Sequence, residues 1–384
     1  MDAAVLIAAQ SGRALAQAAR RAGLRPYVAD LFGDDDTCAL AESCRVMPGR
    51  FGRGMVAGSV LESLDALAAE AGGTLGVILG SGFEDDPGLI TEIGRRYRLI
   101  GTSGEAVGVL KDPFALADLC GRLGLPHPAV SAGPVADPSR WLMKAVGGSG
   151  GGHIRQATAD VPEPGHYLQA RVGGLPYAVN VLAGAGTVRV LAVTAQGCAP
   201  SPGQPFRYGS AVAFAPGEEH PLPPALVAAV SEAAERIARA TGLVGLASVD
   251  FLSDGSRWWL TEVNPRPGAT LDLLDRRSVP LLAAHMEACL GGGAAMSIGA
   301  SPVDAAAGAI CYARTDHAPV PAVAWPDHVR DRPAAGSTVR RDAPLCTVFA
   351  TGADGESARA ALASRMERLR IALNENTKDE EAPV

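Results

Sequence analysis

The chain has 384 residues, of which 47% are hydrophobic, and its formal net charge is −7. That length favours two or three packed lobes, and the acidic balance argues against nucleic acid as a partner. No apolar run approaches the roughly 18–20 residues that span a bilayer, and Asp2 stands where a secretory signal would carry positive charge. The seven cysteines lack CxxC spacing. We therefore expect a cytoplasmic protein with reduced thiols and no membrane partner.

Short apolar runs alternate with helical patterns in the first 105 residues. The pattern predicts strands and helices in the order strand 3–10, helix 13–23, strand 26–31, helix 54–71, strand 75–82 and strand 98–103. Strand–helix alternation with short loops indicates a parallel sheet with crossover helices. We expect residues 1–105 to form an open parallel α/β lobe. No GxGxxG follows the first strand, so a dinucleotide site is not predicted.

The middle of the chain mixes helices with strands that alternate like antiparallel pairs. The expected elements are a helix opened by Lys111 (112–123), strand 141–146, strands within 167–196, helix 222–241, a hairpin over 245–263 and helix 278–290. A Gly/Ala-rich link (291–308) leads to short strands and one last helix, ending near residue 373. The acidic tail 374–384 is expected to be disordered.

The predicted hairpin carries two carboxylates and an amide. Glu262 and Asn264 are two residues apart and share a strand face, and Asp250 reaches the same face if the loop has an odd length, such as three residues with Gly255 in the left-handed region. The two carboxylates would then be diagonal neighbours, roughly 5–8 Å apart. Two carboxylates and an amide oxygen suit Mg²⁺, and Arg266 lies between two prolines where an anion would arrive. The alternative is an exposed strand face.

A glycine-rich segment follows the strand that contains Lys144. The run Gly147-Gly148-Ser149-Gly150-Gly151-Gly152-His153 allows backbone N–H groups to approach phosphate oxygens, and the lysine supplies a point charge. It is not a Walker loop, because the lysine precedes the glycines. The alternative is a flexible linker, although strands flank the run closely.

Taken together, these motifs resemble the ATP-grasp superfamily, which includes biotin carboxylases and carbamoyl-phosphate synthetases. The order of motifs covers about 110–270, and the resemblance extends over nearly the whole chain. It implies an α/β protein with an N-terminal open parallel lobe (1–105), a central ATP-grasp fold of two α+β subdomains (106–290) and a small C-terminal α/β lid-like region (308–373). The chain is most similar to a predicted carboligase branch that includes tyramine–glutamate ligase.

The resemblance also implies roles for individual residues. Lys111 and Lys144 would hold the phosphates of ATP, and Asp250, Glu262 and Asn264 would bind one or two Mg²⁺ ions. Arg266 would stabilise an acyl-phosphate, with Lys144 also acting in catalysis. The remaining nucleotide contacts would come from Gly147, Gly148, Ser149, Gly150, Gly151, Ile154 and Gln169.

Two positions depart from the family pattern. His153 stands where relatives often have glycine, and Thr270 stands where biotin carboxylases have a glutamate base. The implied activity is that of a ligase that phosphorylates a small-molecule carboxylate with ATP and joins it to an amine, in a pathway of the methanofuran or tetrahydromethanopterin type. The alternatives are a bicarbonate-using carboxylase and a non-catalytic ATP-binding subunit, and relatives suggest a homodimer.

Two further features carry weaker signals. The segment Gly80–Glu84 follows the third strand of the first lobe and either lines the acceptor site or forms a turn. Arg189 either reaches the substrate or is an exposed strand charge.

Overall fold

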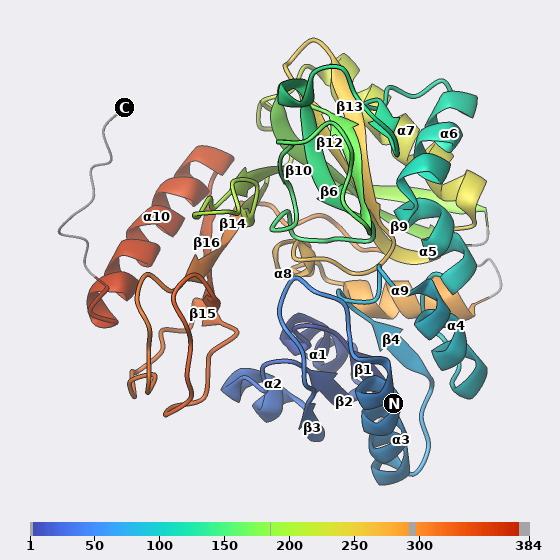
Figure 1. Ribbon diagram of the computed structural model, residues 1–384. Coiled ribbons are helices and arrows are strands. Elements are labelled where there is room, and N and C mark those ends of the chain that lie inside the picture. Colours follow the sequence, from blue (N-terminus) through green and yellow to red (C-terminus); the bar gives the residue numbers. More distant parts are fainter. Residues whose placement is uncertain (1–2, 185, 292–296, 376–384) are drawn as a thin grey trace.

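The computed structural model describes residues 3–184, 186–291 and 297–375 and has three sheets (Figure 1). A parallel four-stranded sheet forms the N-terminal lobe. An eight-stranded antiparallel sheet forms the body of the molecule, and a smaller four-stranded antiparallel sheet lies beside it. This arrangement confirms the predicted α/β class with an α+β centre. Within the described residues, no helix is both long and apolar enough to cross a membrane.

The N-terminal sheet has the strand order β3-β2-β1-β4. Its strands are β1 (Ala4–Ala8), β2 (Arg25–Asp30), β3 (Ser43–Val46) and β4 (Val77–Leu79). Its helices are α1 (Arg13–Arg21), α2 (Asp35–Leu40), α3 (Ala57–Ala71) and α4 (Pro87–Arg96). The predicted strand at 98–103 is wrong, because only Leu99 bridges to Val77 before Ser103 caps the next helix. Strand β3 was not predicted, since it is only four residues long and includes serine and arginine.

The small sheet has the order β5-β8-β6-β7 and carries the glycine-rich segment between β6 and β7. Its strands are β5 (Val130–Ser131), β6 (Trp141–Ala145), β7 (Arg155–Gln156) and β8 (His166–Ala170). Helices α5 (Gly104–Lys111) and α6 (Pro113–Arg122) precede it. The prediction that Lys111 opens a helix is wrong, because Lys111 ends α5. Asp112 begins α6 instead, where its carboxylate accepts hydrogen bonds from the backbone of Phe114 and Ala115.

The large sheet has the order β13-β12-β9-β10-β11-β14-β16-β15. Its strands are β9 (Leu175–Gly184), β10 (Thr187–Cys198), β11 (Tyr208–Ala213), β12 (Gly245–Ser253), β13 (Trp258–Asn264), β14 (Ala305–Tyr312), β15 (Val329–Arg330) and β16 (Pro344–Gly352). Its helices are α7 (Pro224–Thr241), α8 (Leu271–Leu274), α9 (Leu281–Leu290) and α10 (Gly355–Ala372). The C-terminal region therefore shares this sheet, because β14 pairs with β11.

Two predictions near the C-terminus change in detail. Strand β14 begins inside the expected link 291–308, of which 292–296 lies outside the described residues. Glu375, expected in the disordered tail, is buried and accepts hydrogen bonds from His317 and Arg370, each 2.7 Å long. The tail prediction is thus wrong at its first residues, and 376–384 lies outside the described residues.

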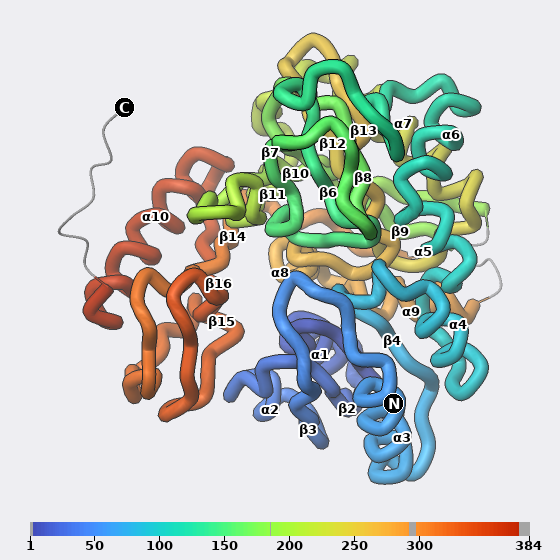
Figure 2. Tube along the Cα trace, in the orientation of Figure 1, coloured from blue at the N-terminus to red at the C-terminus, as the bar shows by residue number. Residues whose placement is uncertain are grey.

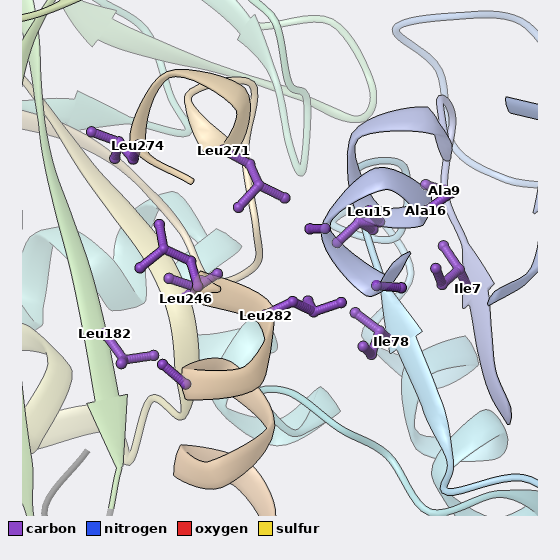
Figure 3. Close-up of a cluster of buried hydrophobic side chains, with 14 of the residues drawn as sticks. Ile7, Ala9, Leu15, Ala16, Ile78, Leu182, Leu246, Leu271, Leu274 and Leu282 are labelled. Atoms are coloured by element: carbon purple, nitrogen blue, oxygen red, sulfur yellow. The ribbon is translucent and has the colours of Figure 1, made fainter. Parts of the chain in front are cut away.

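Apolar side chains join the N-terminal lobe to the large sheet. Ile7, Leu15 and Ile78 of the lobe share one buried cluster with Leu246 of β12 and Leu282 of α9 (Figure 3). The path of the chain in Figure 2 shows the same contact, with the lobe beneath helices α8 and α9. This packing fixes the carboxyl end of β4 next to the segment that follows β13, where the candidate site lies.

Candidate active site

The hairpin of β12 and β13 sets the positions of the three predicted metal ligands. Asp250 lies directly opposite Glu262, and Ser248 lies opposite Asn264. The predicted three-residue loop and diagonal arrangement are wrong: the loop spans residues 254–257, and a β-bulge at Thr261 corrects the register. Gly255 has φ +89, in the left-handed region as predicted. The bulge therefore brings the carboxylates closer than a plain hairpin of odd loop length would.

The two carboxylates and the amide form one connected polar cluster. The Asn264 amide donates to Asp250 Oδ2 at 3.0 Å, and its Oδ1 accepts from Lys111 Nζ at 3.0 Å. Lys111 Nζ also contacts Glu262 Oε1 at 2.5 Å. The structure thus brings together Lys111 and all three predicted metal ligands, with the lysine ammonium held between Glu262 and Asn264.

The two carboxylates differ in protonation because their surroundings differ. Burial raises the pKa of Asp250 to about 7, and the negative charge of Glu262 adds to this effect. Burial acts on Glu262 in the same direction, but the charges of Lys111 and Lys144 outweigh it and lower the Glu262 pKa. The cluster therefore holds one firmly ionised carboxylate and a second that a cation would readily ionise.

Lys144 projects from β6 beneath the glycine-rich segment. Its buried Nζ donates to Gln169 Oε1 at 3.2 Å and lies 5.9 Å from the centre of the Tyr167 ring. Gln169 is itself buried on β8. Lys144 is also close enough to lower the pKa of Glu262. The second predicted lysine and Gln169 therefore belong to the same site.

The glycine-rich segment folds down over this site because two of its glycines leave no room for a side chain. A Cβ on Gly147 (φ +69) would lie 2.4 Å from Asp85 Cα, and one on Gly151 (φ +72) would lie 2.0 Å from the Phe206 carbonyl oxygen. The backbone N–H of Tyr208 donates to the Gly150 carbonyl at 2.8 Å. The segment therefore touches both the N-terminal lobe and β11, which a free linker would not do.

The rest of the segment turns inwards on His153. A Cβ on Gly148 would lie 2.5 Å from the His153 ring, and a ring nitrogen of His153 lies 3.3 Å from the Ser149 carbonyl oxygen. Burial lowers the pKa of His153 to about 4, with Glu262 opposing and Lys144 adding to the effect. Ile154 closes the turn through a hydrogen bond to the Gly151 carbonyl, 3.1 Å long. The histidine is therefore a neutral group packed among the charged residues of the site.

Arg266 points across to the N-terminal lobe, where it meets a residue that sequence reasoning left out of the site. Its Nε donates to Glu84 Oε1 at 2.6 Å, while Glu84 Oε2 accepts from the Gly82 backbone at 2.6 Å. Burial acts to raise the pKa of Glu84, but the positive charges of Arg266 and Lys111 outweigh this effect. The pKa is therefore lowered, to about 2. The signal was present in the Gly80–Glu84 segment, since side chains at the carboxyl end of a parallel strand commonly line sites.

Tyr208 is a second residue that the motifs did not reveal. Burial raises the pKa of its phenol, and the nearby charge of Asp250 adds to the rise. Nothing in its sequence context distinguishes it from an ordinary strand tyrosine.

Two other candidates fall outside the charged cluster. Thr270 donates its hydroxyl to Asn180 Oδ1 at 2.6 Å, so this position holds a neutral hydrogen-bonded pair. Arg189 is exposed on β10. The residue of β10 that lies level with Asp250 is Thr194, and Arg189 is about 16 Å away from Thr194 along the strand. The arrangement favours the exposed strand charge for Arg189.

The site consists of two lysines, two carboxylates, an amide, an arginine and a glycine-rich segment, all gathered at one junction. Cations and backbone N–H groups suit the oxygens of a triphosphate. Two carboxylates and an amide oxygen suit a hard divalent cation. Within the described ranges, this site included, no three side chains of His, Cys, Asp or Glu come together as a metal site, so the candidate ligand set depends on the Asn264 amide as well as the two carboxylates. The site therefore has the side chains that a nucleoside triphosphate bound with a divalent cation would require.

Comparisons with known proteins agree with this interpretation. A family model for the ATP-grasp domain matches residues 114–270, and the chain therefore carries an ATP-grasp domain. The recognition of an ATP-grasp protein from the sequence is confirmed. A search of curated proteins finds no match to the chain.

Several solved structures share the fold. Biotin carboxylase from Campylobacter jejuni, in complex with β-γ-ATP, has a TM-score of 0.69 at 15% identity, covering 97% of this chain and 91% of that one. The biotin carboxylase domain dimer of 2-oxoglutarate carboxylase from Hydrogenobacter thermophilus, in complex with MgADP and bicarbonate, has a TM-score of 0.68 at 14% identity, covering 97% and 90%. L-amino acid ligase from Bacillus licheniformis has a TM-score of 0.68 at 14% identity, covering 96% and 97%. The chain therefore shares the fold of these structures along nearly its whole length.

Proposed function

We propose that this protein is an ATP- and Mg²⁺-dependent ligase that joins a carboxylate to an amine through an acyl-phosphate. The observation that carries the proposal is the convergence of Asp250, Glu262 and Asn264 with Lys111 and Lys144. Lys111 of α5 contacts Glu262 and Asn264 of the distant hairpin, and Lys144 of β6 is close enough to lower the pKa of Glu262. A protein that only bound a nucleotide would have no need of the half-buried Arg266 beside them.

The donor set fits a magnesium ion. The oxygens of Glu262 and Asn264 already face a cation, since both accept from the ammonium of Lys111. Asp250 is the third ligand and would lose its proton to a divalent ion. When bound, Mg²⁺ would offset the negative charge of the phosphate oxygens during transfer.

The chain's own residues would then bind and orient the substrates. Lys111 and Lys144 would contact the phosphates, and the N–H groups of Gly147 to Gly151 would close over them and exclude water. Ser149 and Ile154 belong to the same turn. Gln169, already bonded to Lys144, would position that lysine and contact the nucleotide.

Arg266 would hold the substrate carboxylate and then the acyl-phosphate. A carboxylate oxygen forms a bond to the γ-phosphorus of ATP, the bond to the bridging oxygen breaks, and ADP leaves. The amine nitrogen then attacks the carbonyl carbon and loses a proton, the carbon–oxygen bond to phosphate breaks, and inorganic phosphate leaves. The residues contribute position and charge neutralisation, which dominate phosphoryl transfer.

A bicarbonate-using carboxylase is the main alternative. Thr270 supports the ligase reading, because its hydroxyl is committed to Asn180 and supplies no base at that position. We further propose a cytoplasmic enzyme that forms a homodimer, as the biotin carboxylase domain of 2-oxoglutarate carboxylase does.

The test is release of ADP from ATP in the presence of paired small carboxylates and amines. The panel includes amino acids, precursors of methanofuran- or tetrahydromethanopterin-type cofactors, and bicarbonate alone. We expect ADP release only with a carboxylate and an amine together. Release driven by bicarbonate alone would establish the carboxylase instead.

The variant Glu262→Gln should abolish ADP release while leaving the circular dichroism spectrum unchanged. Glu235→Gln is the matched control, because Glu235 forms a surface ion pair with Arg239 on α7. Full activity of Glu262→Gln would rule out the proposed metal site. ATP binding without ADP release in any mixture would favour a non-catalytic ATP-binding subunit.

A further inference from the structure

The carboxylate of Glu84 lies where the N-terminal lobe meets the segment after β13. The Glu84 side chain is 4% exposed, and that of Arg266 is 16% exposed. One Glu84 oxygen accepts from Arg266 Nε at 2.6 Å, and the other accepts from the Gly82 backbone at 2.6 Å. Glu84 is buried too deeply to meet a substrate itself, so any effect that it has on the reaction passes through Arg266.

The turn after β4 holds Glu84 in a fixed position. The Met55 backbone N–H donates to the Gly82 carbonyl at 3.1 Å. Gly82 has φ +111, a conformation that favours glycine, and a Cβ there would lie 2.7 Å from Gln10 Cγ. This conformation directs the N–H of Gly82 at the Glu84 carboxylate. The carboxylate is therefore held by its own lobe before it meets Arg266.

Arg266 is restrained from its backbone to its guanidinium. Its backbone N–H donates to the Asn264 carbonyl at 2.9 Å, and its Nη1 donates to the Pro267 carbonyl at 3.3 Å. With Nε bound to Glu84, the guanidinium keeps both N–H groups of Nη2, for which the described residues supply no hydrogen-bond partner. Burial raises the pKa of Asp250, and the charge of Arg266 is among those that oppose this rise. The guanidinium therefore lies near the carboxylate cluster with donors to spare.

We propose that Glu84 is a positioning residue that holds the Arg266 guanidinium so that its free N–H groups face the acyl-phosphate. The proposal rests on the proposed function, in which Arg266 binds that intermediate. The N-terminal lobe thereby contributes to the reaction through a single hydrogen bond to a residue of the catalytic site.

Orientation and charge have opposite consequences when the Glu84 carboxylate is removed. A nearby negative charge disfavours an anion, so loss of the charge alone would strengthen the binding of an acyl-phosphate at Arg266. Loss of orientation would weaken that binding. Glu84→Gln separates the two effects, because glutamine has the same shape but only one acceptor oxygen for the two donors, Arg266 Nε and the Gly82 N–H.

The test measures formation of ATP from MgADP and acetyl phosphate, the smallest acyl-phosphate of a carboxylic acid, by the full-length protein. In this reverse step an oxygen of the terminal phosphate of ADP forms a bond to the phosphorus of acetyl phosphate, the bond from phosphorus to the acetyl oxygen breaks, and acetate leaves. Glu84→Gln should raise the KM for acetyl phosphate at least about tenfold, while the affinity for MgADP in calorimetry should change less than about twofold.

Glu70→Gln is the matched control, because Glu70 forms an exposed ion pair with Arg45 in the same lobe, and it should behave as wild type does. An unchanged or lower KM for acetyl phosphate in Glu84→Gln would overturn the proposal. Equal weakening of acetyl phosphate and MgADP would also overturn it, because a purely structural role of Glu84 would disturb both ligands.

A double-mutant cycle shows whether Glu84 acts through Arg266. Arg266→Met should lower kcat/KM for acetyl phosphate. Adding Glu84→Gln to that variant should cause no further loss, because the group that Glu84 positions is already gone. A further loss of about tenfold would overturn the proposal, because Glu84 would then act by a route of its own.

Hydrogen exchange separates this proposal from the proposed function. The Arg266 Nε–H should exchange slowly with solvent in heteronuclear NMR, its signal being the one that Arg266→Met removes, and Glu84→Gln should speed that exchange. If it does so while no carboxylate–amine mixture releases ADP and acetyl phosphate gives no ATP, the orientation of Arg266 by Glu84 stands and the ligase activity fails. If wild type releases ADP with a carboxylate–amine pair but either makes no ATP from acetyl phosphate or is unaffected by Glu84→Gln, the ligase activity stands and the positioning role fails.

Discussion

Replacing Glu84 by glutamine tests whether the buried pair with Arg266 fastens the N-terminal lobe to the hairpin. Burial raises the pKa of Glu84, yet the charges of Arg266 and Lys111 bring it to about 2, against an ordinary value of 4.5. The difference corresponds to about 3 kcal/mol in favour of the folded, ionised state. Because the folded-state pKa is the lower one, this contribution is present above pH 4.5 and is lost as the pH falls towards 2.

We expect Glu84→Gln to lower the free energy of unfolding by about 3 kcal/mol at pH 7 but only by about 1 kcal/mol at pH 3. Urea denaturation followed by tryptophan fluorescence at the two pH values measures both differences. Glu92→Gln is the control, because it removes a carboxylate from an exposed pair with Arg96 on α4 and should change little. A loss of equal size at both pH values, or no loss at pH 7, would refute this reasoning.

Three further predictions concern the glycine-rich segment, a buried histidine and the contacts between lobes. In calorimetry, Gly151→Ala should weaken ATP binding more than Gly150→Ala. Both glycines have positive φ, but only a Cβ at Gly151 would clash with a backbone carbonyl. Equal effects of the two substitutions would contradict the close packing of Gly151. Burial lowers the pKa of His285 to about 4 from 6.5. The contribution of the neutral histidine to stability is therefore fully present above pH 6.5, and the free energy of unfolding should fall by about 2 kcal/mol between pH 7 and 5. In denaturant titrations, His285→Gln should flatten that pH dependence. Arg13 forms buried ion pairs with Asp272 and Asp331, so Arg13→Met should lower the free energy of unfolding by about 3–5 kcal/mol, and a neutral result would show that the carboxylates find other partners.

Local patterns in the sequence were enough to identify the central elements. Alternating apolar residues located β9, β10, β12 and β13 of the large sheet, and Ser253 to Ser256 marked the hairpin turn, but β11 was not predicted and the strands after residue 308 were not located. The spacing of Glu262 and Asn264 placed them on one strand face, as the structure confirms.

What the sequence did not reveal depends on contacts across the fold. The bulge at Thr261 has no local signature, so the register near the turn was wrong. The sequence left Gly80–Glu84 open as either a lining of the acceptor site or a turn, because only the long-range packing of the N-terminal lobe against the loop after β13 brings Glu84 to Arg266. Lys111 was assigned to the wrong end of a helix, since Asp112-Pro113 begins one helix immediately after another ends.

The small sheet that carries the glycine-rich segment has a core of its own. Val135, Met143, Ala157 and Leu168 form an apolar cluster separate from those that bind the lobe to the large sheet. A rotation of this unit as a rigid body would leave the other clusters undisturbed. Such a rotation would have to break the contacts of the glycine-rich segment with Asp85 and Tyr208, whereas the lobe would stay tied to the large sheet by apolar packing and the Arg13 ion pairs.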